Sequence, residues 1–308
     1  MYLVTGGAGF IGSHTVALLC EQGNRVRVLD DLSTGCEANL AGLPVELVVG
    51  SIIDRATVER VMDGCSHVIH LAAIPGVTAS VDDPAGSDRV NVNGAVTVFE
   101  IARRCGVQRV VYASSCAVYG QTEGRVVRET DPLRPTSPYA AGKAADELYA
   151  SVFSQTLGMS CVGMRYQNVF GAKQDPSGAY AAVIPRFVEL ALRGQPLPIQ
   201  GDGEQSRDFV AVADVARANL LAATAPAADG VYNVGTGQRT TVNQIARLVL
   251  GEIPSGVGVE THPPRQGDIR HMRSDPSKAL DELGWRARED FATAMAETIR
   301  WYRGRLEA

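Results

Sequence analysis

The chain opens with the stretch Tyr2-Leu-Val-Thr-Gly6-Gly-Ala-Gly9-Phe-Ile-Gly12, which decides its fold. A short apolar run is followed at once by glycines in a GxxGxxG spacing, and a helical pattern begins behind them. Glycine permits a tight turn, close approach of the backbone to a pyrophosphate, and close packing of a helix on a strand. The N-terminus of the helix adds N–H donors for the phosphates. The stretch therefore predicts a dinucleotide site that includes Gly6, Gly9, Phe10, Ile11 and Gly12.

Short β-branched runs alternate with longer helical stretches through the first half of the chain. This alternation is typical of βαβ units in a parallel sheet. We therefore expect an α/β fold: a Rossmann-type doubly wound parallel sheet with a smaller mixed α/β lobe at the C-terminal end. The expected strands are Tyr2–Thr5, Arg25–Asp30, Val45–Val49, His67–Leu71, Arg109–Ser114 and Ser160–Arg165.

The alternation ends after Asn168, where Pro and Gly become frequent and the helical stretches shorten. We expect a cofactor-binding domain over residues 1–168, to which residues 204–235 return, and a substrate lobe over residues 169–308. The lobe should close over the carboxyl edge of the sheet, where ligands bind in open α/β folds. The helices expected after Asn168 are Tyr180–Arg193, Val212–Thr224, Val242–Leu250 and Asp290–Tyr302.

An acid, Asp30, ends the second expected strand about 20 residues beyond the glycines. A carboxylate there accepts hydrogen bonds from ribose hydroxyls and repels a 2′-phosphate, and no Arg follows within residues 32–35. The sequence therefore favours NAD over NADP as the cofactor. Asp31 is either a second contact of this kind or a solvated loop acid. Nearby loops and strand ends supply further expected cofactor contacts: Ser33, Thr34, Gly35, Ser51, Ile52, Leu71, Ala72 and Ala73.

Tyr139 and Lys143 stand four residues apart, at the two ends of the pentapeptide Tyr-Ala-Ala-Gly-Lys. That spacing places both side chains on one face of a helix. An ammonium beside a phenol favours the phenolate, so the pair can transfer a proton near neutral pH. The strand Arg109–Ser114 leads into Ser115, a hydroxyl at the same sheet edge that is suited to sharing a proton with Tyr139.

Composition argues against several classes of function. The net charge is −5 and there is no basic block, which argues against a nucleic-acid partner. No apolar stretch is long enough to span a bilayer, and the N-terminus lacks the pattern of a secretory signal, so we expect a cytoplasmic protein. The six cysteines are scattered without a CxxC pair and the five histidines lack ligand spacing. We therefore expect reduced thiols and no metal site.

Motifs spread over the whole chain resemble those of the extended short-chain dehydrogenase/reductase family. The group that the chain most resembles is the NAD-dependent nucleotide-sugar epimerases and dehydratases, and within it the UDP-glucose and UDP-N-acetylglucosamine 4-epimerases. The motifs are TGGAGFIGS at residues 5–13, Asn91-Val-Asn-Gly94, Ser114-Ser-Cys-Ala-Val-Tyr-Gly120, Ser137-Pro-Tyr-Ala-Ala-Gly-Lys143, Arg165-Tyr-Gln-Asn-Val-Phe-Gly171, Ser206-Arg-Asp-Phe209 and Arg265-Gln-Gly-Asp268.

The resemblance implies 4-epimerisation of a UDP-hexose through a transient 4-keto sugar. Tyr139 would remove the 4-hydroxyl proton while hydride passes to NAD, Lys143 would bind the nicotinamide ribose, and Ser115 would bridge the 4-oxygen and Tyr139. The resemblance adds Asn91, Tyr166 and Gln167 to the expected cofactor site. The implied substrate contacts are Val77, Ser115, Tyr139, Asn168, Ala182, Val183, Pro198, Ile199, Gln200, Arg207, Arg265, Asp268 and Met272.

Other reactions of this family remain alternatives. Its dehydratases carry an Asp-Glu pair just after the strand-end hydroxyl, where this chain has Cys116 and Ala117. A Cys at this position also occurs in epimerase-reductases together with a His, but no His stands in the matching region, so we interpret Cys116 as a packing residue. Met272 leaves the choice between an acetylated and a plain sugar open. A UDP-glucuronate 4-epimerase and, more remotely, a non-catalytic NAD-binding regulator also remain.

Two further expectations concern structure. Most relatives dimerise through helices that correspond here to Ser87–Cys105 and Tyr139–Leu157, so the resemblance implies a homodimer. The apolar residues expected on the outer faces of these helices, which could equally be core, are Val96, Phe99, Val152 and Phe153. For Arg207 and Asp208, a surface ion pair is the alternative to a substrate contact.

Overall fold

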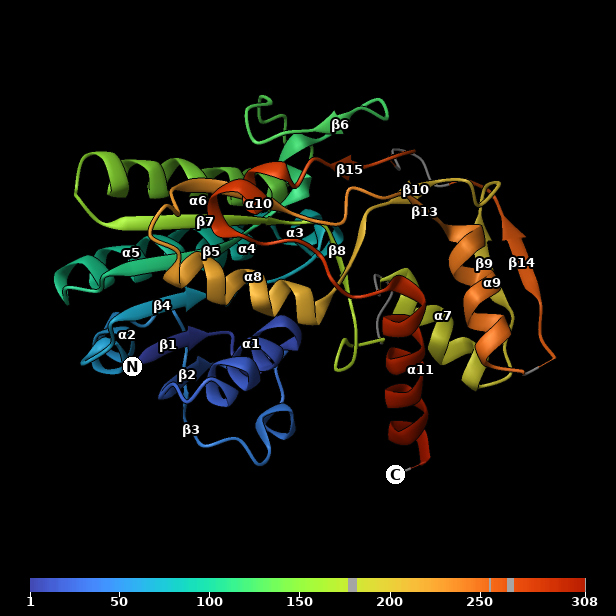
Figure 1. Ribbon diagram of the computed structural model, residues 1–308, viewed down its shortest axis with the longest axis horizontal. Helices are drawn as coiled ribbons and strands as arrows, with labels where there is room; N and C mark the ends of the chain where they lie inside the picture. Colours follow the sequence, from blue (N-terminus) through green and yellow to red (C-terminus); the bar gives the residue numbers. More distant parts are fainter. Residues whose placement is uncertain (177–181, 255, 265–268, 308) are drawn as a thin grey trace.

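Seven parallel strands form the central sheet of the computed structural model, which describes residues 1–176, 182–254, 256–264 and 269–307. Their order is β12-β7-β5-β4-β1-β2-β3, so the winding reverses between β1 and β4 (Figure 1). Such a reversal leaves a crevice at the carboxyl ends of the strands. The strands are β1 (Tyr2–Thr5), β2 (Val26–Asp30), β3 (Val45–Val49), β4 (His67–His70), β5 (Arg109–Ser115), β7 (Ser160–Tyr166) and β12 (Gly230–Val234).

The six strands expected from the sequence are all present, and each begins and ends within one residue of its predicted bounds. The seventh, β12, pairs with β7 at the edge of the sheet and was not predicted as a strand. Its sequence places Asn233 among apolar residues. Asn233 is fully buried, which it tolerates because its side chain forms hydrogen bonds with the Tyr119 hydroxyl and two backbone carbonyls. Those partners lie far away along the chain, so no local pattern announces this strand.

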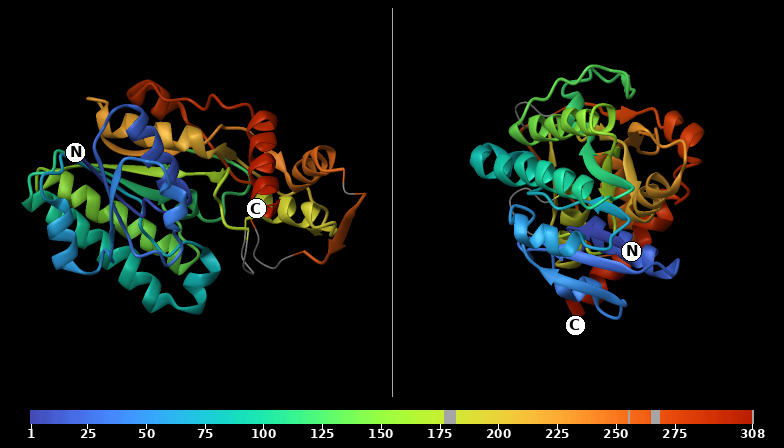
Figure 2. Two further views of the ribbon diagram at one scale, coloured as in Figure 1. Left: turned by 90° about the horizontal axis from the view of Figure 1, so that it is seen from below. Right: turned by 90° about the vertical axis from the view of Figure 1, so that its left-hand side faces the viewer.

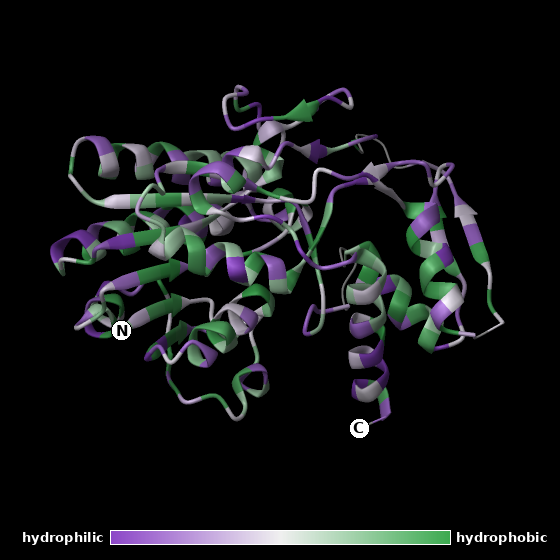
Figure 3. Ribbon diagram, in the orientation of Figure 1, coloured by the Kyte–Doolittle hydropathy of each residue, from purple (hydrophilic) through white to green (hydrophobic). Residues whose placement is uncertain are grey.

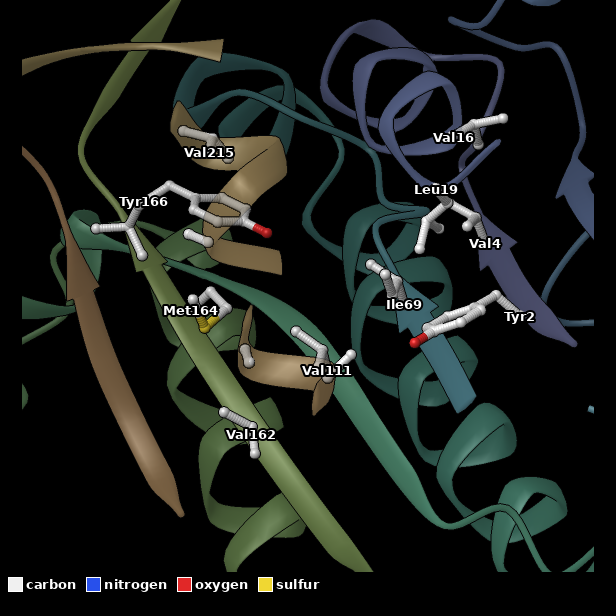
Figure 4. Packing of buried hydrophobic residues seen from close by; sticks show 14 of the residues in the cluster. Tyr2, Val4, Val16, Leu19, Ile69, Val111, Val162, Met164, Tyr166 and Val215 are labelled. Carbon is white, nitrogen blue, oxygen red and sulfur yellow. The ribbon is translucent and has the colours of Figure 1, made fainter. Parts of the chain in front are cut away.

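Helices cover both faces of the sheet, which confirms the doubly wound fold. On one face, α1 and α8 pack over Val4, and on the other α2, α5 and α6 form a core that includes Leu3. Figure 4 shows the first of these cores, with Val16 and Leu19 of α1 beside the strands. Burial on both faces explains why the strands are apolar runs and do not alternate. The helices are α1 (Phe10–Glu21), α2 (Arg55–Met62), α5 (Gly94–Arg104), α6 (Pro138–Gln155), α8 (Val212–Thr224) and α10 (Ser277–Leu283).

The crossover from β4 to β5 contains the helix predicted over Ser87–Cys105, and this helix includes a π-helical turn. Here α3 (Val77–Asp82), α4 (Pro84–Asp88) and a π-helical turn at Arg89–Asn93 lead into α5. Asn91 in that turn is 1% exposed. Its Oδ1 accepts a hydrogen bond from the Ile74 N–H at 2.8 Å, and its Nδ2 donates to the Ile74 carbonyl at 3.0 Å. The turn thus fixes the loop that follows β4.

A smaller mixed α/β lobe lies beyond the carboxyl ends of the sheet, as the sequence predicted (Figure 2). Its core packs three helices against short strands. The strand pairs are β8 with β11, β9 with β14, β10 with β13 and β6 with β15. The elements are β6 (Val126–Val127), β8 (Asn168–Phe170), α7 (Val183–Leu192), β9 (Leu197–Gln200), β10 (Ser206–Arg207), β11 (Phe209–Ala211), β13 (Thr240–Thr241), α9 (Val242–Glu252), β14 (Val259–His262), β15 (Arg273–Ser274) and α11 (Phe291–Glu307).

The segment around α10 packs against the sheet, although the sequence assigned it to the smaller lobe. Leu283 and Trp285 lie in the same core as α8. The Trp285 indole N–H donates to the Asp214 carbonyl of α8 at 2.9 Å, which holds the segment in place. Residues 212–234, which lie within the predicted return of 204–235, pack on the sheet or pair with it. Residues 277–285 pack there as well, which the sequence did not predict.

For two aromatic residues that the sequence placed either on an outer helix face or in the core, the structure shows the core. Phe99 of α5 and Phe153 of α6 are 0% and 6% exposed, and the centroids of their rings lie 5.7 Å apart. Val152, next to Phe153, is 51% exposed as expected. Figure 3 shows how apolar residues concentrate in the strands and on the helices that cover them. Across the described residues, no helix combines the length and the apolar character needed to cross a membrane.

Candidate functional site

A cavity of about 490 Å³ opens over the glycine turn between β1 and α1. Gly6 has a φ of 70°, a conformation that favours glycine. A Cβ added to Gly12 would lie 2.0 Å from the Gly6 carbonyl oxygen and 2.7 Å from the Gly7 Cα. The turn is therefore closed by backbone against backbone, and α1 begins directly behind it at Phe10. This arrangement fits a pyrophosphate at the helix N-terminus.

Asp30 connects two loops of this cavity as well as lining it. Its Oδ2 accepts a hydrogen bond from the Ala8 N–H and its Oδ1 accepts one from the Leu32 N–H, both at 2.9 Å. The neighbouring Asp31 is exposed, and its Oδ1 accepts from the Ser33 N–H and hydroxyl at 3.0 and 2.6 Å. Both acids line the cavity, so both positions suit the ribose contact predicted for Asp30.

Most residues predicted to bind the cofactor line this one cavity. Two of the predicted catalytic residues, Tyr139 and Lys143, lie on its wall too. The predicted residues found there are Gly6, Gly9, Phe10, Ile11, Gly12, Asp30, Asp31, Ser33, Thr34, Ile52, Leu71, Ala72, Ala73, Tyr139, Lys143 and Tyr166.

Four predicted cofactor contacts do not lie on the cavity wall formed by the described residues: Gly35, Ser51, Asn91 and Gln167. Gly35 packs against the Asp30 carboxylate, which would lie 2.8 Å from an added Cβ. Asn91 binds the Ile74 backbone, as described above, and so shapes the wall from behind. Gln167 is 4% exposed, and its amide has no hydrogen-bond partner among the described residues.

The cavity wall also includes a segment that the sequence did not indicate, Lys173, Gln174 and Asp175. Lys173 has a φ of 67°, and its Nζ donates to the Asn39 carbonyl at 2.8 Å. This contact joins the chain after β8 to the loop after β2. No signal in the sequence predicts it, because the two segments meet only in the folded chain. The remaining unpredicted wall residues are Leu29, Gly50, Ile74, Pro75, Val90, Ala113 and Ser114.

The first turns of α6 present Tyr139 and Lys143 to the cavity. Ser137 caps the helix by accepting from the Ala140 N–H at 3.2 Å, and Pro138 occupies the first turn, where proline is tolerated. The Tyr139 N–H donates to the Ser80 hydroxyl of α3 at 2.9 Å, which fixes the start of the helix. Lys143 is 3% exposed, and its Nζ donates to Asp146 Oδ2 at 3.2 Å.

The two serines at the end of β5 have different surroundings. The Ser114 hydroxyl is buried and donates to Glu147 Oε1 at 2.5 Å, so it belongs to a structural network with Arg165. Ser115 is half-buried, and its Oγ accepts from the Ala117 N–H at 3.2 Å. Among the described residues, Ser114 is on the cavity wall and Ser115 is not. The predicted role of Ser115 therefore stays a prediction.

A second cavity, of about 300 Å³, lies in the smaller lobe. Among the described residues, its wall carries two cations, Arg186 and Arg207, and the amides of Gln200 and Gln205. Asn168 also lines it, two residues after Tyr166 on the wall of the first cavity. The chain therefore runs directly from one cavity to the other. Cations beside amides and apolar walls suit a nucleoside diphosphate.

Five of the predicted substrate contacts line the second cavity: Asn168, Val183, Pro198, Gln200 and Arg207. Ile199 and Met272 do not line this cavity, and their roles stay predictions. Ile199 is buried in the core of the lobe and Met272 in a cluster with Val118 and Tyr119. Ala182 and Val77 are exposed at the starts of α7 and α3. Arg265 and Asp268 lie outside the described residues. Unpredicted wall residues are Arg186, Phe187, Gln205, Phe209, Thr240 and Val242.

Two ambiguous side chains now have a clear environment. Asp208 is fully buried and accepts from the Thr236 N–H and hydroxyl, both at 2.7 Å, so a surface ion pair with Arg207 is wrong. Burial raises the pKa of Asp208. Cys116 packs among apolar side chains, and burial raises the pKa of its thiol to about 11, which keeps it neutral. Asp208 therefore belongs to a buried hydrogen-bond network, and Cys116 belongs to an apolar cluster.

Comparison with known proteins covers the whole chain. The model of the NAD dependent epimerase/dehydratase family matches residues 2–235. The chain is 39% identical over 312 residues to the UDP-glucose 4-epimerase of Mycolicibacterium smegmatis, with 99% of each chain covered. It is 37% identical over 313 residues to a dTDP-glucose 4,6-dehydratase of Streptomyces antibioticus, covering 98% of this chain and 92% of that one.

Two solved structures share both lobes with this chain. UDP-glucose 4-epimerase of Thermus thermophilus in complex with NAD has a TM-score of 0.90 and 40% identity, covering 98% of this chain and 99% of that one. UDP-N-acetylglucosamine 4-epimerase of Methanobrevibacter ruminantium in complex with UDP-N-acetylmuramic acid has a TM-score of 0.95 and 37% identity, covering 99% and 98%. The similarity therefore includes the smaller lobe as well as the parallel sheet.

Proposed function

Because the chain belongs to the NAD dependent epimerase/dehydratase family, we propose that it interconverts UDP-hexoses at C4. The pair is UDP-GlcNAc and UDP-GalNAc or UDP-Glc and UDP-Gal. One observation favours epimerisation: Tyr139 and Lys143 share the cofactor cavity, while Cys116 and Ala117 follow Ser115. A buried neutral thiol and a methyl group cannot supply the extra acid and base that a dehydration needs.

NAD is the cofactor of this family, and the first cavity suits it. The turn at Gly6 and Gly12 would hold the pyrophosphate, and Asp30 the adenosine ribose. Lys143 and Tyr166 would lie along the nicotinamide end. When bound, NAD supplies the oxidation of C4 and its reduction from the other face of the sugar. The carboxylates of Asp30 and Asp31 on the wall oppose a 2′-phosphate, which favours NAD over NADP.

Proton transfer is the task proposed for the residues of the chain itself. Tyr139 takes the proton of the sugar 4-hydroxyl through its phenolate oxygen and later returns it to the 4-oxygen. The buried Lys143 ammonium favours that phenolate, because an opposite charge nearby stabilises an ionised group. Ser115 would hold the 4-oxygen by a hydrogen bond. The same three groups serve both directions, as an interconversion requires.

The second cavity is proposed to bind the nucleotide diphosphate of the substrate. Arg186 and Arg207 would contact the phosphates, and Gln200 and Gln205 offer amide groups to a pyrimidine. The relative from Methanobrevibacter ruminantium, solved with UDP-N-acetylmuramic acid, supports a UDP-linked substrate. Since the chain passes from Tyr166 to Asn168 between the cavities, one molecule can place its sugar near Tyr139 and its nucleotide in the smaller lobe.

The proposal extends to the assembly. The exposed face of α6 carries Leu148, Tyr149 and Val152, which are 66%, 45% and 51% exposed. A contiguous apolar face of this kind is suited to pairing with a second copy of the chain. We therefore propose a homodimer through α5 and α6, working in the cytoplasm.

The test compares Tyr139→Phe with Tyr149→Phe, which removes an exposed hydroxyl from the same helix. Each protein is incubated with UDP-Glc, UDP-GlcNAc and UDP-glucuronate, and the anomeric protons are followed by NMR. We expect turnover with one or both of the first two sugars and none with UDP-glucuronate. Turnover should be lost in Tyr139→Phe and keep its wild-type rate in Tyr149→Phe. Retention of more than about 5% of the rate by Tyr139→Phe would contradict the proposal, given that acid–base groups contribute at least about a hundredfold. A 4-keto-6-deoxy product would instead assign a dehydratase.

A further inference from the structure

Helix α6 carries two buried acids in succession, Asp146 and Glu147, and each pairs with a different buried cation. Glu147 binds the Arg165 guanidinium through both oxygens, at 2.8 and 2.7 Å. Asp146 accepts from the Lys143 ammonium at 3.2 Å, one helical turn away. Lys143 and Asp146 are 3% and 1% exposed. Of these two acids, Asp146 is therefore the one that pairs with the Lys143 ammonium at the cavity wall.

The two acids differ in how completely they are bound. Glu147 also accepts from the Ser114 hydroxyl, so it is held by three donors of two residues. Asp146 Oδ1 has no hydrogen-bond partner within the described part of the chain. Burial raises the pKa of Asp146 to about 6, and the Lys143 ammonium opposes that rise. The ionised form of Asp146 therefore depends on Lys143, whereas Glu147 is held in a closed hydrogen-bond network.

The charged and titratable groups around the pair come from four elements. Glu147 of α6 and Asp88 of α4 are acids that disfavour ionisation of Asp146, while the Tyr112 phenol of β5 is neutral because burial raises its pKa well above the usual value. His70 of β4 interacts electrostatically with Lys143, and burial lowers its pKa to about 3, so it is neutral too. The electrostatic balance at Lys143 is therefore set by Asp146.

We propose that Asp146 is a positioning residue that holds the Lys143 ammonium at the cavity wall and limits how strongly its charge acts on Tyr139. The inference rests on the proposed function, in which the ammonium favours the Tyr139 phenolate. An ammonium next to a carboxylate acts at a distance as a dipole, and its field falls off faster than that of a single charge. Without the carboxylate, the full positive charge of Lys143 would act on Tyr139, which lines the same cavity.

The experiment titrates the Tyr139 phenol itself, by the near-ultraviolet absorbance of tyrosinate. Wild-type protein and Asp146→Asn are compared after their nucleotide content is matched, and each spectrum is corrected with the same protein carrying Tyr139→Phe. We expect Asp146→Asn to ionise Tyr139 at lower pH, with an ionisation constant about tenfold larger. Asp88→Asn is the control, because it removes a nearby acid that does not bind Lys143, and its titration should match wild type. An unchanged or opposite shift in Asp146→Asn would overturn the proposal.

A second arm asks whether Asp146 acts through Lys143. In a Lys143→Met background, Asp146→Asn should shift the Tyr139 titration far less, since the charge that it unmasks is gone. A shift of equal size there would overturn the proposal, because Asp146 would then act on Tyr139 directly. If Asp146→Asn does not fold, Asp146→Ser enters the same two comparisons. The readout does not use turnover, so the two proposals can fail separately. No shift in Asp146→Asn together with an inactive Tyr139→Phe contradicts the role of Asp146 and leaves the proposed function intact. A shift in Asp146→Asn together with an active Tyr139→Phe contradicts the proposed function instead.

Discussion

The cofactor cavity has Tyr166 on its wall and the second cavity has Asn168, two residues later, yet the two cavities are built differently. Turns that follow β1, β2 and β4 form much of the first, where backbone groups set the shape. Side chains that β8, α7, β9 and β10 bring together form the second, where Arg186 and Arg207 supply the charge. We call the turn at Gly6 and Gly12 in the first cavity the backbone cradle, and the wall around Arg186 and Arg207 in the second the side-chain cradle. The backbone cradle accepts little change in shape, whereas the side-chain cradle can lose one contact at a time. The two cavities should therefore fail in different ways.

The largest expected effect comes from Gly12→Ala in the backbone cradle. The new Cβ would lie 2.0 Å from the Gly6 carbonyl oxygen and 2.7 Å from the Gly7 Cα. Because both are backbone atoms, no side chain can move aside and the turn must open. We expect loss of bound NAD and a fall in turnover of roughly a hundredfold or more, the scale of an ångström-sized misplacement. Release of nicotinamide on denaturation measures the bound cofactor. Arg186 and Arg207, in the other cavity, should still bind UDP.

The matched control is Gly251→Ala in α9, where an added Cβ would meet no atom within 4 Å. It makes the same chemical change in a helix, so it should keep NAD and turnover at wild-type levels. Its free energy of unfolding should rise by about 0.5–1 kcal/mol, because alanine is the better helix former. A Gly12→Ala protein that retained stoichiometric NAD would show that the turn is not the rigid cradle described here.

A smaller and selective effect is expected from Arg207→Gln in the side-chain cradle. The change removes one cation from the wall but leaves Arg186 and the packing of the lobe, so the Kd for UDP should rise by about tenfold. Calorimetric titration with UDP measures this directly. Bound NAD should be unchanged, in contrast to Gly12→Ala.

For Arg207→Gln the control is Arg193→Gln at the end of α7, whose side chain is 57% exposed and paired with Glu189. A surface pair of this kind contributes little, so the Kd for UDP should stay at its wild-type value. Equal affinities for UDP in Arg207→Gln and wild type would mean that the second cavity does not bind the diphosphate. Loss of NAD from Arg207→Gln would mean that the two cavities are one unit.

The same contrast explains what could be predicted from the sequence. Gly6, Gly12 and Asp30 lie in short continuous motifs next to strand ends, where the spacing itself states the geometry. Tyr139 and Lys143 follow from a helical spacing. Lys173 escaped prediction because it reaches the cavity through a contact with the loop after β2, far away along the chain. Local patterns therefore described the backbone cradle well.

The side-chain cradle was predicted only in part, since periodicity cannot tell which face of a short element meets a cavity. Pro198 and Gln200 line the wall, while Ile199 between them points into the core. Phe99 shows the same limit on α5, because its sequence left an outer face and the core as equal alternatives, and it is fully buried against Phe153. Such assignments depend on which elements pack together, and that is decided by the whole fold.

The smallest expected effect concerns Gln167, the junction residue of the chain between Tyr166 on the first cavity wall and Asn168 on the second. The side chain is 4% exposed, and both polar atoms of its amide lack hydrogen-bond partners in the described ranges. A buried polar group in that condition costs stability, so Gln167→Met should raise the free energy of unfolding by about 1 kcal/mol. Denaturant titration measures the gain. Because Gln167 lies on neither cavity wall, bound NAD and the Kd for UDP should not change.

Gln205→Met is the matched comparison, because its amide lines the second cavity and donates to the Gln200 carbonyl at 3.0 Å. That variant should weaken UDP binding and gain no stability, since it removes a satisfied group from a wall. If Gln167→Met instead lost NAD or UDP affinity, its amide would belong to the site, and the junction would be part of the side-chain cradle. A gain in stability without either loss would make Gln167 a structural residue between two independent cavities.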